Sequence, residues 1–485
     1  MYAKFSMSDP LVPTPDEIRT LGRAALERIA AYFESLPERP VYIPATSRAL
    51  REQLAEPLPE SGAGFDSLLD TLDRTLVHYS RHSAHPRMFG YVASPGTPVS
   101  AVGAMLNAAW NINVTAWRSA PSGVEMEHVT IGWLKEMLGY PAGAMGLFVS
   151  GGSMASFAAL AAARSAKAPV DVMRAGVGAV GRPMCLYLSS EGHFSMRKAI
   201  GMLGLGEDNV REVPTDPCFH IDLAALEEAV DRDLARGCLP FCVVANAGAT
   251  ATGAFDPIGP LADFARRRDL WLHVDAAYGG FAALAPSARP LFDRIGEADS
   301  VALDPHKWAY LAMGTGCVLY RDPARALAAF AHNADYTRPI GLERDEAFAF
   351  WNYGPELSRP LRALDLWLLF KYVGARRLGE AIEGNLACAR HFESLVRESG
   401  DFEMLAPVEL SVFCFRHAPR GFAGDLNAYN ERLLLALQRG GSSYLSNATV
   451  RGRFALRGCV LNYRTTPRDM EILLEDVRRA ARAIA

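Results

Sequence analysis

The sequence predicts an α/β protein with a mostly parallel central sheet, a helical arm before it and a smaller α+β domain after it. Short apolar runs alternate with helical segments through the middle of the chain, as in βαβ units. These runs are continuously apolar, which is typical of strands buried on both faces. The pattern changes near residue 376. We therefore expect an arm over 1–85, a large domain over 86–375 and a small domain over 376–485.

The arm is expected to contain two helices. A helix over 14–36 is predicted because Thr14 can cap it, Pro15 suits its first turn, and apolar residues follow at helical spacing. Residues 37–64 are rich in proline and glutamate, which indicates an extended segment. A second helix is expected over about 65–81.

Five apolar runs are expected to form the central sheet. A helix over 153–167 follows the first run, and further helical segments separate the others, so the strands should lie parallel. The runs are Gly146–Val149, Met184–Leu188, Phe241–Ala245, Leu270–Val274 and Ser300–Leu303.

The small domain is expected to mix helices with fewer strands. A long helix over 376–399 precedes an apolar run over 409–415, and a helix over 425–439 precedes another run over 455–462. A final helix should begin near residue 467.

Composition excludes several classes of partner. Half of the 485 residues are apolar and 21% are charged, and the net charge is −4. This charge gives no electrostatic reason to expect nucleic acid or an anionic membrane. No apolar run is long enough to cross a bilayer, and the first residues lack the apolar segment of a signal peptide.

The eight cysteines are scattered and form no CxxC pair, so neither a metal site nor a redox motif is expected. Scattered thiols are typical of a reducing compartment, which predicts a cytoplasmic protein.

The glycines at 176, 178 and 181 match the GxGxxG pattern of dinucleotide-binding loops. That reading needs a strand before the glycines and a helix that begins within them. Here Arg182, Pro183 and a strand follow instead, so we expect a surface turn.

Lys307 and Asp275 carry the functional prediction. Lys307 follows the last apolar run in Asp-Pro-His-Lys-Trp, thirty-two positions after Asp275 in His-Val-Asp-Ala-Ala-Tyr. A lysine amine can bond covalently to an aldehyde cofactor, and an aspartate at a strand end can keep a ring nitrogen protonated. Pyridoxal phosphate (PLP) needs both contacts to act as an electron sink.

The run Ser150-Gly151-Gly152-Ser153 is a candidate phosphate cradle. It follows a strand and opens a helix, where unpaired N–H groups and the helix dipole favour an anion. Taken alone, this run is better explained as a glycine turn capped by serine.

His193 lies just past another strand, where an imidazole could stack on a flat ring or transfer protons. A lone histidine is more often structural. The combination changes this balance, because the glycine run, His193, Asp275 and Lys307 each follow an apolar strand. Their strand ends should meet at one edge of one sheet.

These residues resemble the group II PLP-dependent amino-acid decarboxylases, and most closely the aromatic-L-amino-acid decarboxylases. The resemblance covers nearly the whole chain, and the HVDAAY and HKW motifs at their present spacing are its most specific part. The motifs are His85-Pro86, Ser119-Ala120-Pro121 with Glu125-Met126-Glu127, 150–153, His193, 273–278, 304–308, 357–364 and 462–466.

The resemblance implies PLP-dependent transferase fold type I and a homodimer with active sites near the subunit interface. It implies that Lys307 bonds to the cofactor, that Asp275 contacts its ring nitrogen and that His193 lies over its ring. The remaining cofactor contacts would be Gly151, Gly152, Ser153 and His306 at the phosphate, with Thr250 and Ala277 at the ring.

One position departs from the family pattern. The family protonates its product from a tyrosine on a mobile loop, and ungapped alignment from Tyr336 to Arg359 places Phe350 there. Phenylalanine donates no proton. In relatives with this replacement, the resemblance implies an oxidative outcome that consumes O2 and releases an aldehyde, ammonia and peroxide. Alternatively, Tyr353, His193 or water supplies the proton.

The expected substrate pocket departs as well. Asn113 and Thr115 stand before Trp117 where the family has apolar residues, and Val92 replaces an aromatic position next to Tyr91. Arg118 either meets an acidic substrate or points to solvent, as most arginines do. These changes weaken the expectation of an aromatic substrate without removing it.

The leading hypothesis is decarboxylation of an aromatic L-amino acid to its amine. The alternatives are oxidative deamination to an aldehyde, aminotransfer on the same fold, and a catalytically silent PLP-binding protein.

Overall fold

The computed structural model describes residues 11–332, 343 and 346–484. Its centre is a seven-stranded sheet in the order β1-β7-β6-β5-β4-β2-β3, in which only β7 runs antiparallel to its neighbours. The strands are β1 Met145–Val149, β2 Met184–Ser189, β3 Val210–Val213, β4 Leu239–Asn246, β5 Trp271–Ala276, β6 Ser300–Leu303 and β7 Gly316–Tyr320. The predicted α/β class and mostly parallel sheet are confirmed.

All five predicted strands are present, and β3 and β7 are additional. β3 lies at an edge of the sheet and has the sequence Val-Arg-Glu-Val, with too few apolar residues to stand out. β7 is apolar and buried. It follows β6 without a crossover helix and therefore runs antiparallel, outside the βαβ pattern.

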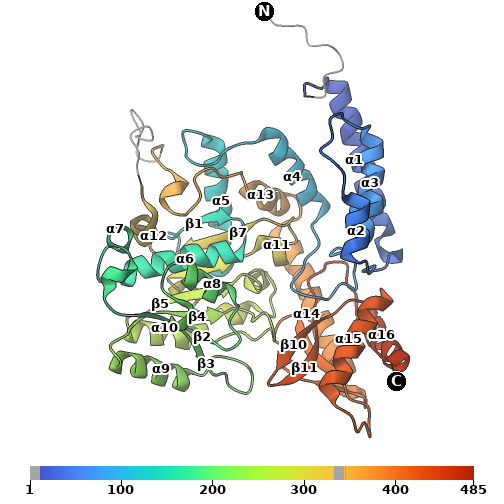
Figure 1. Cartoon of the computed structure of the whole chain (residues 1–485). Helices are drawn as coiled ribbons and strands as arrows, with labels where there is room; N and C mark the ends of the chain where they lie inside the picture. Colours follow the sequence, from blue (N-terminus) through green and yellow to red (C-terminus); the bar gives the residue numbers. More distant parts are fainter. Residues whose placement is uncertain (1–10, 333–342, 344–345, 485) are drawn as a thin grey trace, which may run out of the picture.

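Helices cover both faces of this sheet (Figure 1). Because such crossovers are generally right-handed, the strand order puts α6 and α8 on one face and α9 and α10 on the other. The helices of this domain are α4 Pro98–Trp110, α5 Pro121–Leu138, α6 Gly152–Lys167, α7 Val172–Ala175, α8 Ser195–Met202, α9 Leu223–Ala235, α10 Ile258–Arg267, α11 Pro305–Trp308, α12 Pro323–Phe330 and α13 Ala363–Tyr372.

The segment with the GxGxxG pattern is a short 3-10 helix, Val177–Val180, between α7 and β2. No strand precedes it and no longer helix begins within it in this described segment. The geometry required of a dinucleotide loop is therefore missing.

The C-terminal residues form a four-stranded antiparallel sheet in the order β10-β11-β9-β8. Its apolar core includes residues of the helices that precede, connect and follow the strands. These elements are α14 Ala375–Glu398, β8 Phe402–Met404, β9 Val412–His417, α15 Leu426–Gly440, β10 Ser446–Val450, β11 Arg453–Cys459 and α16 Pro467–Ile484. The elements match the expected α+β lobe, whereas the exact boundaries of the three predicted domains stay predictions.

The N-terminal arm stands beside the rest of the chain (Figure 1). Its helices are α1 Pro15–Ser35, α2 Ser47–Leu54 and α3 Phe65–Leu72, and α3 continues as a π-helical turn to Val77. The predicted capping residue Thr14 forms a capping box with Glu17. The prediction that 37–64 is wholly extended was wrong, because α2 begins there behind a Thr46 cap. Its polar composition concealed the helix.

Candidate active site

A cavity of about 320 Å³ opens where the parallel strands of the large sheet end. The carboxyl ends of β1, β2, β4, β5 and β6 all contribute to its wall, as the sequence predicted for strand-end residues. It is lined by Ser150, Gly151, Gly152, Ser153, Met154, His193, Ser195, Gly248, Thr250, Asp275, Ala277, Tyr278, Asp304, His306 and Lys307.

Lys307 enters the cavity from α11, the single helical turn after β6. Its Nζ lies 3.2 Å from Oδ2 of Asp304, a carboxylate that is only 3% exposed on its side chain. The other oxygen of Asp304, Oδ1, is buried without a hydrogen-bond partner. The next residue, Trp308, anchors the turn by donating from Nε1 to Asn385. The ion pair with Asp304, three residues earlier in the chain, therefore holds the Lys307 amine at the cavity wall.

Asp275 is the penultimate residue of β5, and its Oδ1 accepts the N–H of Ala277 at 3.1 Å. Across the cavity, Nδ1 of His193 accepts the N–H of Ser195 at 3.3 Å and lies 2.7 Å from its hydroxyl. Burial lowers the pKa of His193, although the charge of Asp275 opposes this effect. We infer a neutral imidazole near pH 7 whose remaining proton is on Nε2.

The glycine run has no room for side chains. A Cβ on Gly152 would lie 2.7 Å from Ala277 Cβ and 2.7 Å from Asp304 Oδ2. On the neighbouring strand β7, a Cβ on Gly316 would lie 2.5 Å from the Cα of Gly151. The sixteen-residue helix α6 begins here without a side-chain cap, so its first N–H groups remain available to an anion.

His306 and Thr250 complete two further walls. The Nδ1–H of His306 donates to the carbonyl of Thr315 at 2.8 Å, and its Nε2 lies 3.7 Å from Asp304. Thr250 comes two residues after Gly248, whose φ of +98° favours glycine. Beside them, the ring of Tyr278 stacks on Trp308 at a centroid distance of 5.1 Å.

This arrangement fits pyridoxal phosphate. The uncapped start of α6 suits a phosphate, the strand-end carboxylate of Asp275 suits a ring nitrogen, and the amine of Lys307 suits an aldehyde. The glycine cradle, which a Cβ would fill, leaves space for the backbone to approach such a group closely.

A buried ion pair supports the strand that leads into the glycine run. Arg359 and Glu127, both with fully buried side chains, meet at 2.6 Å. Glu127 also accepts the N–H of Phe148 in β1, and Arg359 donates to the Phe148 carbonyl. These residues belong to motifs that the sequence singled out, and their contacts explain them as scaffold.

Of the positions expected to bear on proton donation, His193 lines the cavity, whereas Phe350 and Tyr353 do not. Phe350 is fully buried, with its ring 5.4 Å from that of His128 and 4.3 Å below the guanidinium of Arg359. Tyr353 stacks on Phe348 at 5.5 Å. Neither Phe350 nor Tyr353 is among the described residues that line the cavity. Tyr336, where the aligned segment began, lies outside the described residues.

The expected substrate residues also lie outside the cavity of this single chain. Two of them bind the backbone of the segment around Phe350 and Arg359. The side-chain oxygen of Asn113 accepts the N–H of Arg359, and the carbonyl of Thr115 accepts the N–H of Phe350. Trp117 is half-buried. Arg118 is exposed. Of the remaining two, Tyr91 is half-exposed and Val92 partly buried.

Sequence reasoning did not assign Asp304, Ser195 or Tyr278 to the site. Asp304 directly follows β6 and Tyr278 closely follows β5, so position alone could have indicated both. Ser195 could have been found as a hydroxyl two residues after His193.

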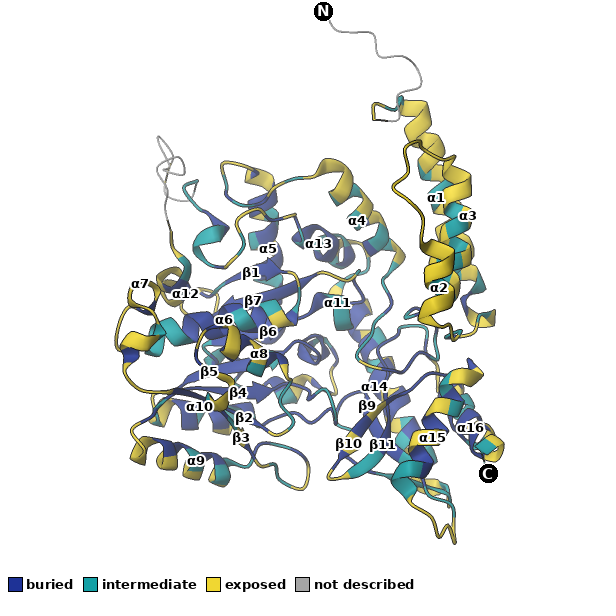
Figure 2. Cartoon of the chain, viewed as in Figure 1, coloured by how far each residue is buried: buried dark blue, intermediate teal, exposed yellow. Residues whose placement is uncertain are grey.

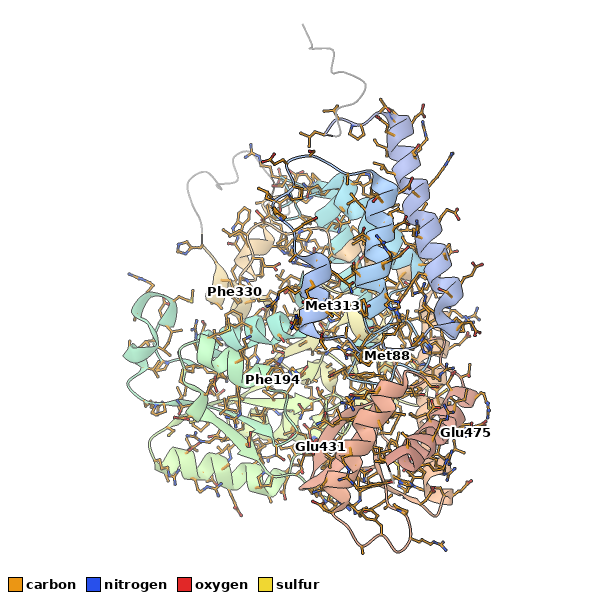
Figure 3. The ribbon with its side chains drawn as sticks, turned by 45° about the vertical axis from the view of Figure 1, so that its right-hand side comes forward. Met88, Phe194, Met313, Phe330, Glu431 and Glu475 are labelled. Atoms are coloured by element: carbon orange, nitrogen blue, oxygen red, sulfur yellow. The ribbon has the colours of Figure 1, made fainter. Side chains whose placement is uncertain are left out.

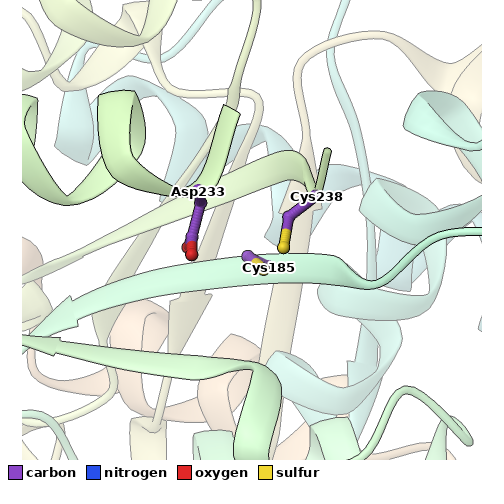
Figure 4. Close-up of side chains that lie close together, drawn as sticks. All are labelled: Cys185, Asp233 and Cys238. Carbon is purple, nitrogen blue, oxygen red and sulfur yellow. The ribbon is translucent and has the colours of Figure 1, made fainter. Parts of the chain in front are cut away.

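A separate polar cluster lies between strand β2 and helix α9 (Figure 4). Atoms of Cys185, Asp233 and Cys238 that could hold a metal lie within 4.8 Å of one another. Arg211 already donates to Asp233 at 2.8 Å and lies 3.2 Å from the sulfur of Cys185, while Tyr187 donates to Asp233 at 2.7 Å. Burial raises the pKa of Cys185 to about 12, so its thiol stays neutral. The cluster is an internal ion pair that joins Arg211 of β3 to Asp233 of α9, with a hydrogen bond from Tyr187 of β2.

Comparison with known proteins decides the family. The model of the pyridoxal-dependent decarboxylase conserved domain matches residues 47–418, more than half of the chain. The chain belongs to the pyridoxal-dependent decarboxylase family. It is therefore a PLP-dependent amino-acid decarboxylase, and the resemblance inferred from its motifs is confirmed.

Similar proteins span almost the whole chain. An aromatic-L-amino-acid decarboxylase from Bacillus atrophaeus is 34% identical and aligns with 99% of this chain and 98% of its own. The tyrosine decarboxylase 2 of Arabidopsis thaliana is 30% identical over 91% of this chain and 83% of its own. The solved structure of Oryza sativa TDC with PLP and tryptamine superposes with a TM-score of 0.91 at 28% identity. That superposition covers 98% of this chain and 99% of the other.

Proposed function

We propose that this decarboxylase acts on an aromatic L-amino acid and releases the corresponding amine. The proposal is supported by relatives of similar length that are named for aromatic, tyrosine and tryptophan substrates. The strand-end cluster around Lys307 supports the PLP-dependent chemistry, because the amine, the carboxylate and the anion cradle lie around one cavity.

In this proposal, each side of the cavity binds one part of the cofactor. Lys307 bonds to the aldehyde carbon, Asp275 keeps the ring nitrogen protonated, and Ala277 packs against the ring with Thr250. The start of α6, with Gly151, Gly152 and Ser153, and the ring of His306 bind the phosphate. When bound, the cofactor supplies an electron-accepting ring that stabilises the carbanion left by loss of CO2.

We assign proton transfer to His193. Of the donors considered from the sequence, His193 lines the cavity, whereas Tyr353 packs on Phe348. Because Nδ1 accepts from Ser195, the proton on Nε2 is the one directed to other groups. Because burial lowers the pKa of His193, its imidazole is neutral rather than positively charged beside Lys307.

We also propose a homodimer. Within the described chain, none of the helices α1, α2 and α3 has a buried residue (Figure 2). Ion pairs from Arg28 of α1 to Asp70 and Asp73, both at 2.5 Å, are what join α1 to the α3 segment. Exposed apolar surface of this extent is typical of an interface. The exposed large apolar residues of the described arm are Leu11, Val12, Ile18, Leu21, Leu26, Ile29, Leu54, Leu58, Phe65, Leu68, Leu72 and Leu76.

Two further exposed apolar side chains support a second copy near the cavity. Phe194 follows the cavity residue His193 and is 72% exposed, and Met313 follows α11 and is 79% exposed (Figure 3). A substrate contact from Trp117 would then come from the neighbouring subunit. This would explain why the cavity of one chain does not include this residue.

A cytoplasmic location is proposed as well, because all eight cysteines are free thiols and only Cys218 is exposed. Among the described residues, no helix is both long and apolar enough to span a membrane.

The test is product analysis by mass spectrometry with a panel of L-amino acids, with and without oxygen. An amine from an aromatic substrate supports the proposal. An aldehyde with ammonia and peroxide would support the oxidative alternative suggested by Phe350. A solved structure named for aldehyde formation, that of Rhodiola rosea 4-hydroxyphenylacetaldehyde synthase, has a TM-score of 0.89 at 26% identity and covers 97% of this chain and 99% of its own. Turnover that requires a keto acid and releases no CO2 would indicate aminotransfer. Absence of any product would indicate a silent PLP-binding protein.

Borohydride reduction locates the cofactor bond independently of activity. We expect the reduced adduct on Lys307, because its amine is the lysine nitrogen in the cavity. A label on another side chain would overturn the assignment of every cofactor contact above.

A further inference from the structure

Arg457 in β11 is a buried arginine with an unusual set of partners. It is 3% exposed, and within the described chain no carboxylate lies within 4.0 Å of its guanidinium. By contrast, Arg453 on the same strand and Arg416 on β9 both pair with Glu403 at 2.6–2.7 Å. A buried charge is costly unless its hydrogen bonds are satisfied, so the partners of Arg457 indicate its role.

Those partners are oxygens of two segments, one of which contains the cavity residue Thr250. Nη2 donates to the carbonyl of Thr250 at 2.5 Å, and Nη1 donates to the carbonyl of Tyr91 at 2.8 Å. Longer contacts reach the Ala251 carbonyl from Nε and the Ser446 hydroxyl from Nη1, both at 3.4 Å. One planar group thus holds residues 91 and 250, which are far apart in the sequence.

Both segments contain backbone turns with positive φ, and the one at Tyr91 is strained. Tyr91 has a φ of +62°, a strained conformation for a residue with a side chain, and its N–H is held by Ser446 at 3.2 Å. The segment of Thr250 runs between Gly248 and Gly253, which both have positive φ. The Arg457 fork fixes the backbone oxygens of both segments from the small lobe.

We propose that Arg457 is a positioning residue that couples the cofactor side of the active site to its substrate side. It sets the place of Thr250 against the cofactor ring and the place of Tyr91 and Val92 in the substrate pocket. This inference rests on the proposed roles of those residues. Since it acts through two separated carbonyls, the planar fork matters and the positive charge alone does not suffice.

The experiment compares Arg457→Lys and Arg457→Met with the control Arg453→Met. The control removes an arginine of the same strand whose side chain is 39% exposed and faces Glu403. PLP is titrated into each apoenzyme by absorbance, steady-state kinetics are measured with the best amino acid from the panel, and the melting temperature of each apoenzyme is recorded.

We expect both Arg457 variants to bind PLP about tenfold more weakly and to lose about 10- to 100-fold in kcat/KM, with KM raised, because misplaced binding groups have effects of this size. The control should stay within about twofold of the wild type. Arg457→Lys should be nearly as impaired as Arg457→Met, since one ammonium cannot span both carbonyls.

Wild-type PLP affinity and KM in a folded Arg457→Lys chain would overturn the proposal. So would a chain that fails to fold with lysine, because the role would then be structural. Should Arg457→Met alone fail to fold, the lysine variant decides. Failure of the wild type to give a reducible PLP adduct on Lys307 would instead refute the proposed function.

Discussion

Replacing Gly316 by alanine tests whether the fit between β7 and the glycine run controls cofactor binding. A Cβ at this position would lie 2.5 Å from the Cα and carbonyl carbon of Gly151 and 2.8 Å from its nitrogen. Ordinary contacts between such atoms are about 3.5–4.0 Å, so one backbone must move by about 1 Å. The obstacle is backbone on both sides, and a side-chain rotation cannot relieve it.

Two effects of this substitution can be measured separately. Overpacking of this kind costs about 1–3 kcal/mol of unfolding free energy, which urea denaturation of the apoenzyme would report. A displacement of about 1 Å in the phosphate cradle should weaken catalysis by about 100-fold and weaken PLP binding with it. Absorbance titration of the apoenzyme with PLP measures the second effect.

Gly132→Ala is the matched control, because a Cβ there meets no atom within 4 Å and the residue lies inside α5. It should be neutral or stabilising by up to about 1 kcal/mol. A Gly316→Ala enzyme with wild-type PLP affinity and stability would refute the argument that β7 fixes the cradle.

Three further outcomes are expected. Lys307→Ala should abolish the borohydride-reducible PLP adduct. The melting temperature of the apoenzyme should change little, because the Lys307 side chain is partly exposed. An adduct found by mass spectrometry of the reduced variant would show that another lysine bonds to the cofactor. Glu127→Gln should destabilise the fold by about 3–5 kcal/mol in urea denaturation, since it removes the charge that compensates fully buried Arg359; a loss below about 1 kcal/mol would contradict this reading. Burial opposes protonation of His220, but Glu409 and Asp216 outweigh it and raise the pKa of His220. A raised folded pKa stabilises the native state fully below the ordinary value and loses this contribution as pH rises through the folded value. His220→Gln should therefore be less stable than the wild type at pH 6, and the difference should shrink toward pH 9; a gap independent of pH would show that the imidazole acts by packing alone.

The sequence predicted the site well where a residue's role depends on strand position. Ser153, His193, Asp275 and Lys307 each follow an apolar strand, and a parallel sheet brings such ends together whatever the connecting helices contain. The same logic failed for β7, because an antiparallel strand without a crossover helix leaves no alternating pattern. Local periodicity therefore located the cavity more reliably than it located every strand.

Contacts between distant segments could not be predicted. Arg457 reads as an ordinary residue of an apolar strand, and its carbonyl partners follow from how the small lobe packs. Phe350 shows the converse limit. Alignment placed it where the family has a proton-donating tyrosine, and this chain buries its ring between His128 and Arg359. A matched position in a loop does not determine where packing places the side chain.

The edge position of β1 links cofactor uptake to the integrity of the sheet. Within the sheet β1 is bonded only to β7, and it delivers the glycine run to the cavity. A ligand that binds only the folded edge adds about RT ln(1 + [L]/Kd) to stability, near 2.7 kcal/mol at a hundredfold excess over Kd. Amide protons of Leu147 and Phe148 should accordingly exchange more slowly with solvent once PLP is added. Vitamin B6 supply would then govern how long this protein survives as well as how fast it works.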